Sequence, residues 1–301
     1  GILGGEPLLY EPLFDVLARH PDSYFQIFTN GTLLSEEIAG QMRKLGNVTP
    51  LISIEGLEAE NSDRRGLDKA FSSSLEAIKA CHINKLVIGC ASSICKTNYK
   101  ELVSESWLQF LISKGVHYVW YYIYRPAGKS PFREKALSRE EILELRRFIV
   151  EKRSKFPILI VDAYWDADGK ALCPAATGIS HHINPEGYVE PCPVIQFADK
   201  CNLKATDEIA QTIKESKYLT NFRKIASESG RGCIFMENPV LLKNFVFNDA
   251  IISTSGRNNA LSELDAEPLP SHDTAPELVP EKKFFYKFAK KNWFFGFGAY
   301  G

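Results

Sequence analysis

The feature that most constrains the fold is an alternation of two sequence patterns. From Ile2 to about Val161, short apolar, β-branched or aromatic runs alternate with longer segments in which apolar residues recur at helical spacing. This alternation predicts a parallel sheet covered by helices with right-handed crossovers, either an open doubly wound sheet or a partial or closed barrel. The expected strands are 2–3, 24–29, 48–54, 85–92, 117–124 and 158–161, and the expected helices are 8–19, 35–45, 67–81, 100–113 and 138–155.

The alternation ends near Asp162, and Gly, Pro and Cys accumulate beyond it. We therefore expect a domain at 1–161 and a smaller module at 162–252. Residues 253–281 are rich in Ser, Asn, Pro and acidic side chains, which predicts a flexible linker. Residues 282–301 interleave five lysines with aromatic residues. This tail suits an anionic membrane surface, an acidic partner or nucleic acid, or else a helix packed over the barrel.

Composition excludes several classes of protein. The chain has 36 Lys and Arg against 37 Asp and Glu, so no excess of positive charge indicates nucleic acid as the main partner. No apolar run reaches the roughly 18 residues of a membrane-spanning helix. Seven cysteines are scattered through 301 residues, which argues against a disulfide framework. We expect a reducing, cytoplasmic compartment, with thiols that are buried or bound to metal.

Polar residues follow several of the expected strands, where loops of parallel α/β proteins bind ligands. Taken singly, these loops are also common tight turns. Together they offer a carboxylate for an amine, hydroxyl and carboxylate groups for a ribose, and a guanidinium for a carboxylate. This inventory suits an amino-acid nucleoside. The loops are Gly4-Gly5-Glu6-Pro7, Thr29-Asn30-Gly31-Thr32, Ser53-Ile54-Glu55-Gly56 and Tyr124-Arg125-Pro126.

The first three loops give the sequence its resemblance to the radical S-adenosylmethionine (SAM) superfamily, over roughly residues 1–240. Gly4-Gly5-Glu6-Pro7 resembles the family's glycine-glycine-glutamate motif, Thr29-Asn30 the end of the next strand, and Ser53 to Gly56 the ribose-contacting strand end. The resemblance implies a partial (β/α)6 TIM-like barrel. It also implies SAM binding, with Gly4, Gly5 and Glu6 on the methionyl ammonium.

By the same resemblance, Ser53 and Glu55 face the ribose or the methionyl carboxylate. Asp63-Arg64-Arg65-Gly66 is similar to a segment that supplies a carboxylate-binding arginine in some members, which favours Arg65 over Arg64; a solvated basic pair is the alternative.

The family's CxxxCxxC motif, which holds a [4Fe-4S] cluster, is missing from these 301 residues. Because the sequence starts abruptly at Gly1, we expect an N-terminally truncated chain whose cluster ligands lie outside it, and we expect that this fragment alone does not cleave SAM.

A second cysteine pattern lies in the smaller module. Cys173 is followed by thirteen residues, Gly187, four more residues and Cys192, across an expected strand-turn-strand. A hairpin brings such thiols together, as in zinc and iron-sulfur sites. The pattern resembles the start of the SPASM or twitch module, which implies one auxiliary [4Fe-4S] cluster. Cys233 is favoured as the third ligand and Cys201 is a weaker fourth; without Cys201, one iron is open.

Other assignments of the polar and thiol groups stay open. Cys173 and Cys192 could be two unrelated buried thiols, or could bind zinc with one of His181 and His182. Cys81 and Cys90 are expected in the core, and Cys95 is undecided.

The resemblance implies a radical SAM enzyme that abstracts hydrogen from a peptide or small molecule and takes electrons from a flavodoxin or ferredoxin. The rival hypotheses are a non-catalytic iron-sulfur or zinc-binding scaffold and an α/β nucleotide-binding enzyme that uses zinc.

Overall fold

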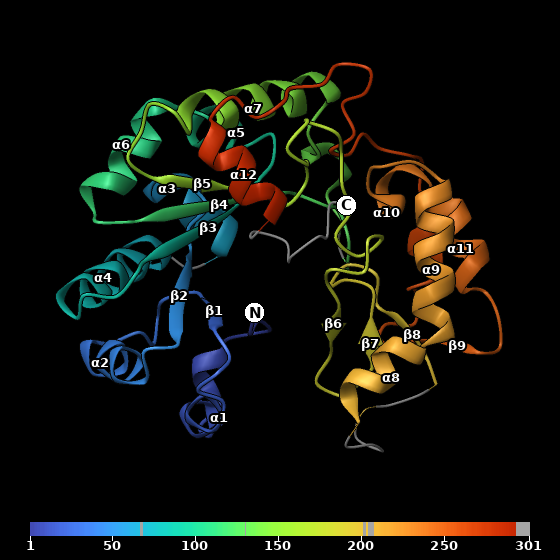
Figure 1. Cartoon of the computed structure of the whole chain (residues 1–301), viewed down its shortest axis with the longest axis horizontal. Helices are drawn as coiled ribbons and strands as arrows, with labels where there is room; N and C mark the ends of the chain where they lie inside the picture. Colours follow the sequence, from blue (N-terminus) through green and yellow to red (C-terminus); the bar gives the residue numbers. More distant parts are fainter. Residues whose placement is uncertain (67–68, 130, 201–202, 204–207, 293–301) are drawn as a thin grey trace. The chain divides into compact units, whose positions relative to one another are not determined.

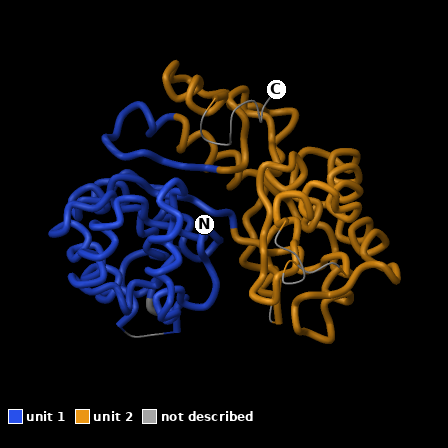
Figure 2. Tube along the Cα trace, turned by 60° about the horizontal axis from the view of Figure 1, so that its bottom comes forward, with its two compact units in different colours: residues 1–123, 151–162 blue, residues 124–150, 163–301 orange. Residues whose placement is uncertain are grey.

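The structure is a computed structural model that describes residues 1–66, 69–129, 131–200, 203 and 208–292. It forms two compact units (Figure 2). Residues 1–123 and 151–162 make the first unit, and residues 124–150 and 163–301 make the second. The expected boundary at 161 is therefore incomplete. Residues 124–150 already belong to the second unit, and the chain returns to the first unit at residues 151–162.

The first unit is built on a parallel sheet whose strands follow one another in sequence order (Figure 1). Ile2 forms a parallel bridge with Ile27, so residues 2–3 add a short edge beside β1. A sheet that grows in one direction is singly wound, which confirms the partial barrel and excludes the doubly wound alternative. The strands are β1 (Phe25–Thr29), β2 (Val48–Ser53), β3 (Gly89–Ile94), β4 (Tyr118–Ile123) and β5 (Leu159–Val161).

The helices of the first unit precede or connect these strands, and all but the helix at Glu58–Arg65 lie where the helical spacing predicts them. Ser35 caps α2 by accepting a hydrogen bond from the Ile38 amide at 3.2 Å. The expected helix 8–19 is broken near Pro12, and the expected helix 100–113 is broken at Ser104, which caps α6. The elements are η1 (Pro7–Leu9), α1 (Leu13–Arg19), α2 (Glu36–Leu45), α3 (Glu58–Arg65), α4 (Ala70–Ile83), α5 (Tyr99–Leu102) and α6 (Glu105–Ser113). Helix α7 (Arg139–Lys152) starts in the second unit and ends in the first.

The core of the first unit lies between the sheet and its helices. Leu51 and Ile52 of β2 are both fully buried, as strands covered on both faces should be. The thiols of Cys81 and Cys90 are fully buried too, which confirms them as core residues. Gly89 is required at its position because a side chain there would meet the Tyr118 ring at 2.1 Å.

The second unit packs short strands against helices. The hairpin expected after Cys173 is present, with β6 (His182–Ile183) antiparallel to β7 (Val189–Glu190). A buried core that includes Leu219, Phe222 and Leu242 joins the helices of this unit. The other elements are η2 (Arg133–Lys135), β8 (Phe197–Asp199), α8 (Ile209–Glu215), α9 (Lys217–Glu228), α10 (Ile234–Glu237), α11 (Pro239–Val246), β9 (Ile251–Ser253), η4 (Ser262–Asp265) and α12 (Phe284–Asn292).

The segment 253–281 differs from the flexible linker that its composition predicts. Ser271, His272 and Thr274 are each at most 2% exposed. The Ser271 hydroxyl accepts a hydrogen bond from the Cys233 amide at 2.9 Å, and the Arg139 guanidinium donates to the Thr274 carbonyl at 3.0 Å. The polar side chains that suggested solvent are thus hydrogen-bonded inside the second unit.

No helix in the described part of the chain has the length and apolar character that crossing a membrane requires.

Candidate functional site

The candidate site lies at the carboxyl edge of the sheet in the first unit. Residues 2–3, β1, β2 and β3 are neighbours and run parallel, so the loops that follow them meet at one edge. The structure therefore brings together the three loops that the sequence analysis selected in this unit, which begin at Gly4, Thr29 and Ser53.

The carboxylate of Glu6 ties the first loop to the end of β1. Its Oε1 accepts hydrogen bonds from the Thr29 hydroxyl at 2.9 Å and the Leu8 amide at 3.2 Å. Its Oε2 accepts one from the Asn30 amide at 2.8 Å. Pro7 follows as the buried first residue of η1. Three of the roughly four acceptor positions of Glu6 are used within the protein, so Glu6 holds the loop and keeps one position for a ligand.

The two glycines before Glu6 leave space and acceptors open. Gly4 has a φ of 139°, which favours glycine, and a side chain at Gly4 or Gly5 would meet nothing within 4 Å. Among the described residues, neither glycine carbonyl accepts a backbone hydrogen bond. The hydroxyl of Ser53, at the end of β2, is half-buried and also has no hydrogen-bond partner there.

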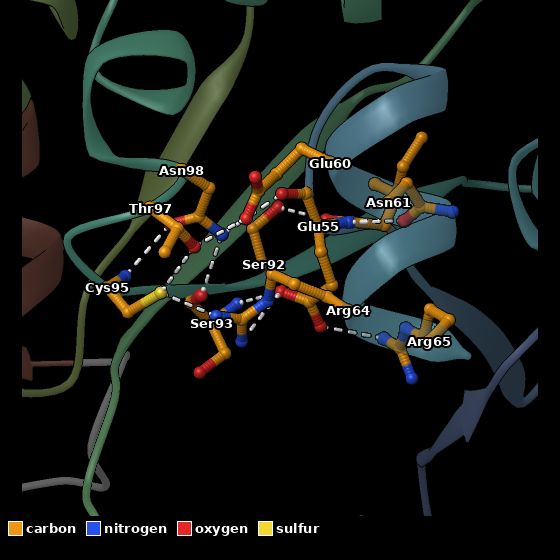
Figure 3. A network of polar contacts seen from close by, with 11 residues as sticks. Glu55, Glu60, Asn61, Arg64, Arg65, Ser92, Ser93, Cys95, Thr97 and Asn98 are labelled. Carbon is orange, nitrogen blue, oxygen red and sulfur yellow. Dashed lines mark hydrogen bonds and ion pairs between the residues drawn. The ribbon is translucent and has the colours of Figure 1, made fainter. Parts of the chain in front are cut away.

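Glu55 lies in a polar network that the protein itself completes (Figure 3). Its Oε1 is 2.7 Å from Nη2 of Arg65, and its Oε2 accepts a hydrogen bond from the Ser93 amide at 2.8 Å. Nη2 of Arg64 lies 3.8 Å from Oε2. Glu55 is only 7% exposed. Its contacts favour a positioning role, and the expectation that it meets a ribose or carboxylate stays a prediction.

Two asparagine side chains hydrogen-bond to the backbone of Glu55. The Asn61 side chain accepts from the Glu55 amide at 2.7 Å, and the Asn98 side chain donates to the Glu55 carbonyl at 3.0 Å. Both asparagines are fully buried. They join the end of β2 to α3 and to the loop after β3, and the sequence analysis missed them. A buried asparagine in the otherwise polar α3 gave no signal of its own.

Cys95, undecided from the sequence, belongs to this network. It is fully buried, and its thiol lies 2.5 Å from Nη1 of Arg64 and 3.2 Å from the Thr97 hydroxyl. Arg64 is therefore directed at Glu55 and Cys95, and Nε of Arg65 is buried without a hydrogen-bond partner among the described residues. A guanidinium with an unused donor can bind an anionic group such as a carboxylate.

Cys173, Cys192 and Cys233, the described cysteines of the second unit, interact electrostatically. Burial raises the pKa of Cys192 to about 12, with contributions from Cys233 and Cys173 in the same direction. Burial and Cys233 likewise raise the pKa of Cys173. Three of the four thiols proposed as ligands are thus near enough to interact electrostatically, their role as ligands stays a prediction, and Cys201 lies outside the described residues.

Arg125, from the fourth selected loop, lies beside these thiols. Its guanidinium carbon is 5.2 Å from the centre of the Tyr164 ring. Burial acts to lower the pKa of Arg125, but Tyr164 and the three thiols outweigh this and raise it above its usual value. Arg125 in turn acts to lower the pKa of Cys173 and Cys192, but it only partly offsets the effect of their burial.

Among the residues that the structure describes, no group of three His, Cys, Asp or Glu is arranged to hold a metal ion. Nδ1 of His182 is 2.6 Å from Glu190, and Nε2 of His181 is 3.3 Å from Arg223. Each histidine thus has one ring nitrogen in a polar contact with a residue other than a cysteine, and the zinc alternative stays a prediction. The donor chemistry fits an iron-sulfur cluster, and the present arrangement is not a preformed metal site.

Comparison with curated proteins gives relatives that are named as synthases of heme or related tetrapyrroles. No family model matches the chain. Fe-coproporphyrin III synthase of Methanosarcina barkeri is 28% identical over 173 residues, which are 54% of this chain and 43% of the relative. AdoMet-dependent heme synthase of the same organism is 29% identical over 124 residues, 40% of this chain and 34% of the relative. The chain thus spans less than half the length of these relatives.

Solved structures agree on the fold. SuiB of Streptococcus suis matches with a TM-score of 0.60 and 15% identity, over 74% of this chain and 56% of SuiB. The protein anSMEcpe with bound AdoMet matches with a TM-score of 0.57 and 17% identity, over 74% of this chain and 68% of that protein. At such identities the likeness shows the fold alone.

Proposed function

We propose that this chain, a relative of radical SAM heme synthases with the fold of radical SAM enzymes, binds SAM at the carboxyl edge of its sheet. One observation carries the proposal. Glu6 fixes the glycine loop against the end of β1, which leaves the Gly4 and Gly5 carbonyls open at the edge where β2 presents the Ser53 hydroxyl.

Each group has a role in this pose. The glycine carbonyls accept hydrogen bonds from the methionyl ammonium, with the remaining acceptor position of Glu6 beside them. Asn30 is held by Glu6 at its amide and by Thr32 at its side-chain oxygen, so it lines the loop in a fixed orientation. Arg65 attracts the methionyl carboxylate, while Glu55 keeps the Arg65 guanidinium in place.

The whole enzyme would carry out a one-electron reaction. When it receives one electron from a flavodoxin or ferredoxin, SAM would supply methionine and a 5′-deoxyadenosyl radical, which would take a hydrogen atom from the substrate. The residues of this chain do not fit the cluster that delivers the electron, because no CxxxCxxC occurs in them. This chain's part is to bind and orient SAM.

Isothermal titration of the chain with SAM tests the binding site. Ser53→Ala should weaken binding about fivefold through the loss of one hydrogen bond. Ser113→Ala is the matched control, since Ser113 ends α6 near the opposite edge of the sheet and bonds only to Phe110. Absence of SAM binding, or equal loss in both variants, would overturn the assignment.

We further propose one auxiliary iron-sulfur cluster held by Cys173, Cys192 and Cys233. Their electrostatic interaction with Arg125 supports it, because a cation stabilises the negative charge of a thiolate-bound cluster. Cys201 would add a fourth ligand, and without it one iron is open to substrate. Anaerobic reconstitution and iron analysis test the proposal. If the chain binds no iron, both the auxiliary cluster and the rival hypothesis of a non-catalytic iron-sulfur scaffold are wrong.

The sequence relatives also favour one substrate class. Fe-coproporphyrin III synthase, heme synthase and pre-heme d1 synthase are all named for tetrapyrroles. We therefore propose a tetrapyrrole substrate over a peptide. Titration of the chain with iron coproporphyrin, followed by its visible absorbance, should show saturable binding; binding of unrelated peptides with none of the porphyrin would reverse the choice.

A further inference from the structure

The terminal helix α12 faces outward with the side chains that helices usually bury. Phe284 and Phe285 are 74% and 76% exposed, and Phe288 is 47% exposed. Lys290 on the same helix is only 1% exposed. A helix free to rotate would bury its phenylalanines and expose its lysine, because each buried aromatic side chain is favourable by about 1.5–3 kcal/mol. Something must fix the rotation of α12.

Buried charges fix that rotation. Nζ of Lys290 lies 3.2 Å from Oε1 of Glu281, and the same oxygen lies 2.8 Å from Nη1 of Arg146. All three side chains are at most 1% exposed. The Arg146 guanidinium also lies 5.3 Å from the centre of the Trp165 ring, and the Glu281 amide donates to the Ala167 carbonyl at 3.0 Å. Rotating α12 would pull Lys290 off a buried carboxylate, so the aromatic face stays outside.

The helix is also surrounded by positive charge. Lys282 and Lys283 precede it and are exposed. Lys287 and Lys291 lie 3.2 and 3.9 Å from Asp168, whose single carboxylate serves both. No acidic residue occurs from 282 to 301, and residues 293–300 add Trp and further Phe and Tyr to the sequence. An aromatic surface is thus flanked by more lysines than nearby carboxylates neutralise.

We propose that α12 docks the protein on a lipid bilayer with anionic headgroups. Phenylalanines enter the boundary between headgroups and acyl chains, while flanking lysines meet the headgroup phosphates. A bilayer fits better than an acidic protein because the three phenylalanines lie at helical spacing, all three are exposed, and exposed lysines flank them. This surface is separate from the SAM and cluster sites, and its test does not depend on them.

Co-sedimentation with vesicles tests the proposal. The chain should sediment with vesicles of equal parts phosphatidylcholine and phosphatidylglycerol, and far less with phosphatidylcholine alone. Replacing Phe284, Phe285 and Phe288 together by Ser should lower the partition coefficient about a hundredfold. Replacing Lys282 and Lys283 by Ser should lower it about fivefold per lysine and make it less sensitive to salt. Phe247→Ser is the matched control, since Phe247 is 73% exposed on the same unit.

Thermal unfolding checks that each variant is folded before its binding is compared. Failure of the unaltered chain to bind anionic vesicles overturns the proposal and favours an acidic protein as the partner of α12. Equal binding to both vesicle types overturns the role of the lysines, and equal loss in Phe247→Ser and the triple variant overturns the role of α12.

Discussion

Removing the charge of Glu281 should be among the most damaging conservative changes in the second unit. Glu281→Gln keeps the size of the side chain but leaves Arg146 and Lys290, both at most 1% exposed, without the carboxylate that lies 2.8 and 3.2 Å from them. Breaking a buried ion pair by removing one partner costs about 3–5 kcal/mol. The second unit should lose about that much free energy of unfolding.

The matched variant is Lys290→Met, which removes one of the two cations. The group of three carries two positive charges and one negative charge, so this variant leaves a neutral Arg146–Glu281 pair under a side chain of similar length. We expect a change below about 1 kcal/mol. The difference between the two changes in free energy of unfolding reports the effect of the buried charge more directly than either change alone.

Urea unfolding is the suitable assay because urea, unlike guanidinium, is uncharged and does not screen ion pairs. With a slope of about 2 kcal/mol per molar, Glu281→Gln should lower the midpoint of the second unit by about 2 M, and Lys290→Met by well under 1 M. Equal midpoint shifts in the two variants would refute the reasoning, since they would show that packing and not charge dominates at this site.

Three further predictions concern the proposed sites. Glu6→Gln replaces an acceptor oxygen by a donor amide facing Thr29 and nearby amides, so SAM affinity measured by titration should fall at least about tenfold; unchanged affinity would contradict the loop assignment. Cys192→Ser should reduce iron bound after anaerobic reconstitution, whereas Cys81→Ala in the core of the first unit should not; equal iron in both would exclude Cys192 as a ligand. Burial raises the pKa of Glu237, only partly opposed by a hydrogen bond from a serine, so its contribution to stability is present at low pH and is lost as the pH rises from about 4.5 through its folded pKa. Glu237→Gln should remove this slope from urea midpoints measured against pH, and an unaltered slope would assign it to another group.

The sheet could be predicted from the sequence because each strand is a short apolar run between segments of helical spacing. The predicted bounds are wrong where local backbone geometry, which these patterns do not record, sets the start or end of an element. The expected strand 85–92 begins instead at Gly89, since Lys85 has a φ of 56° and Leu86 donates back to the Cys81 carbonyl, so the chain is still turning there. Helix α3 was not expected because its residues are almost all polar and give no apolar stripe.

The candidate site shows a different limit. The strand-end loops indicated Glu55 and the family resemblance implied Arg65, but neither could show that the two pair with each other at 2.7 Å. The same holds for Asn61 and Asn98, whose partners come from separate loops. By contrast, the Cys173 to Cys192 hairpin was predictable because its turn, strands and thiols are all local in sequence.

The path of the backbone between the two compact units limits how the protein can be divided. The chain passes from one unit to the other after residues 123, 150 and 162, and α7 belongs to both. No single cut therefore separates the two units: ending the chain at 162 keeps the first unit whole but leaves residues 124–150 attached without the rest of the unit to which they belong. The two units are interleaved along the chain, so we expect that they must be expressed together to pack fully.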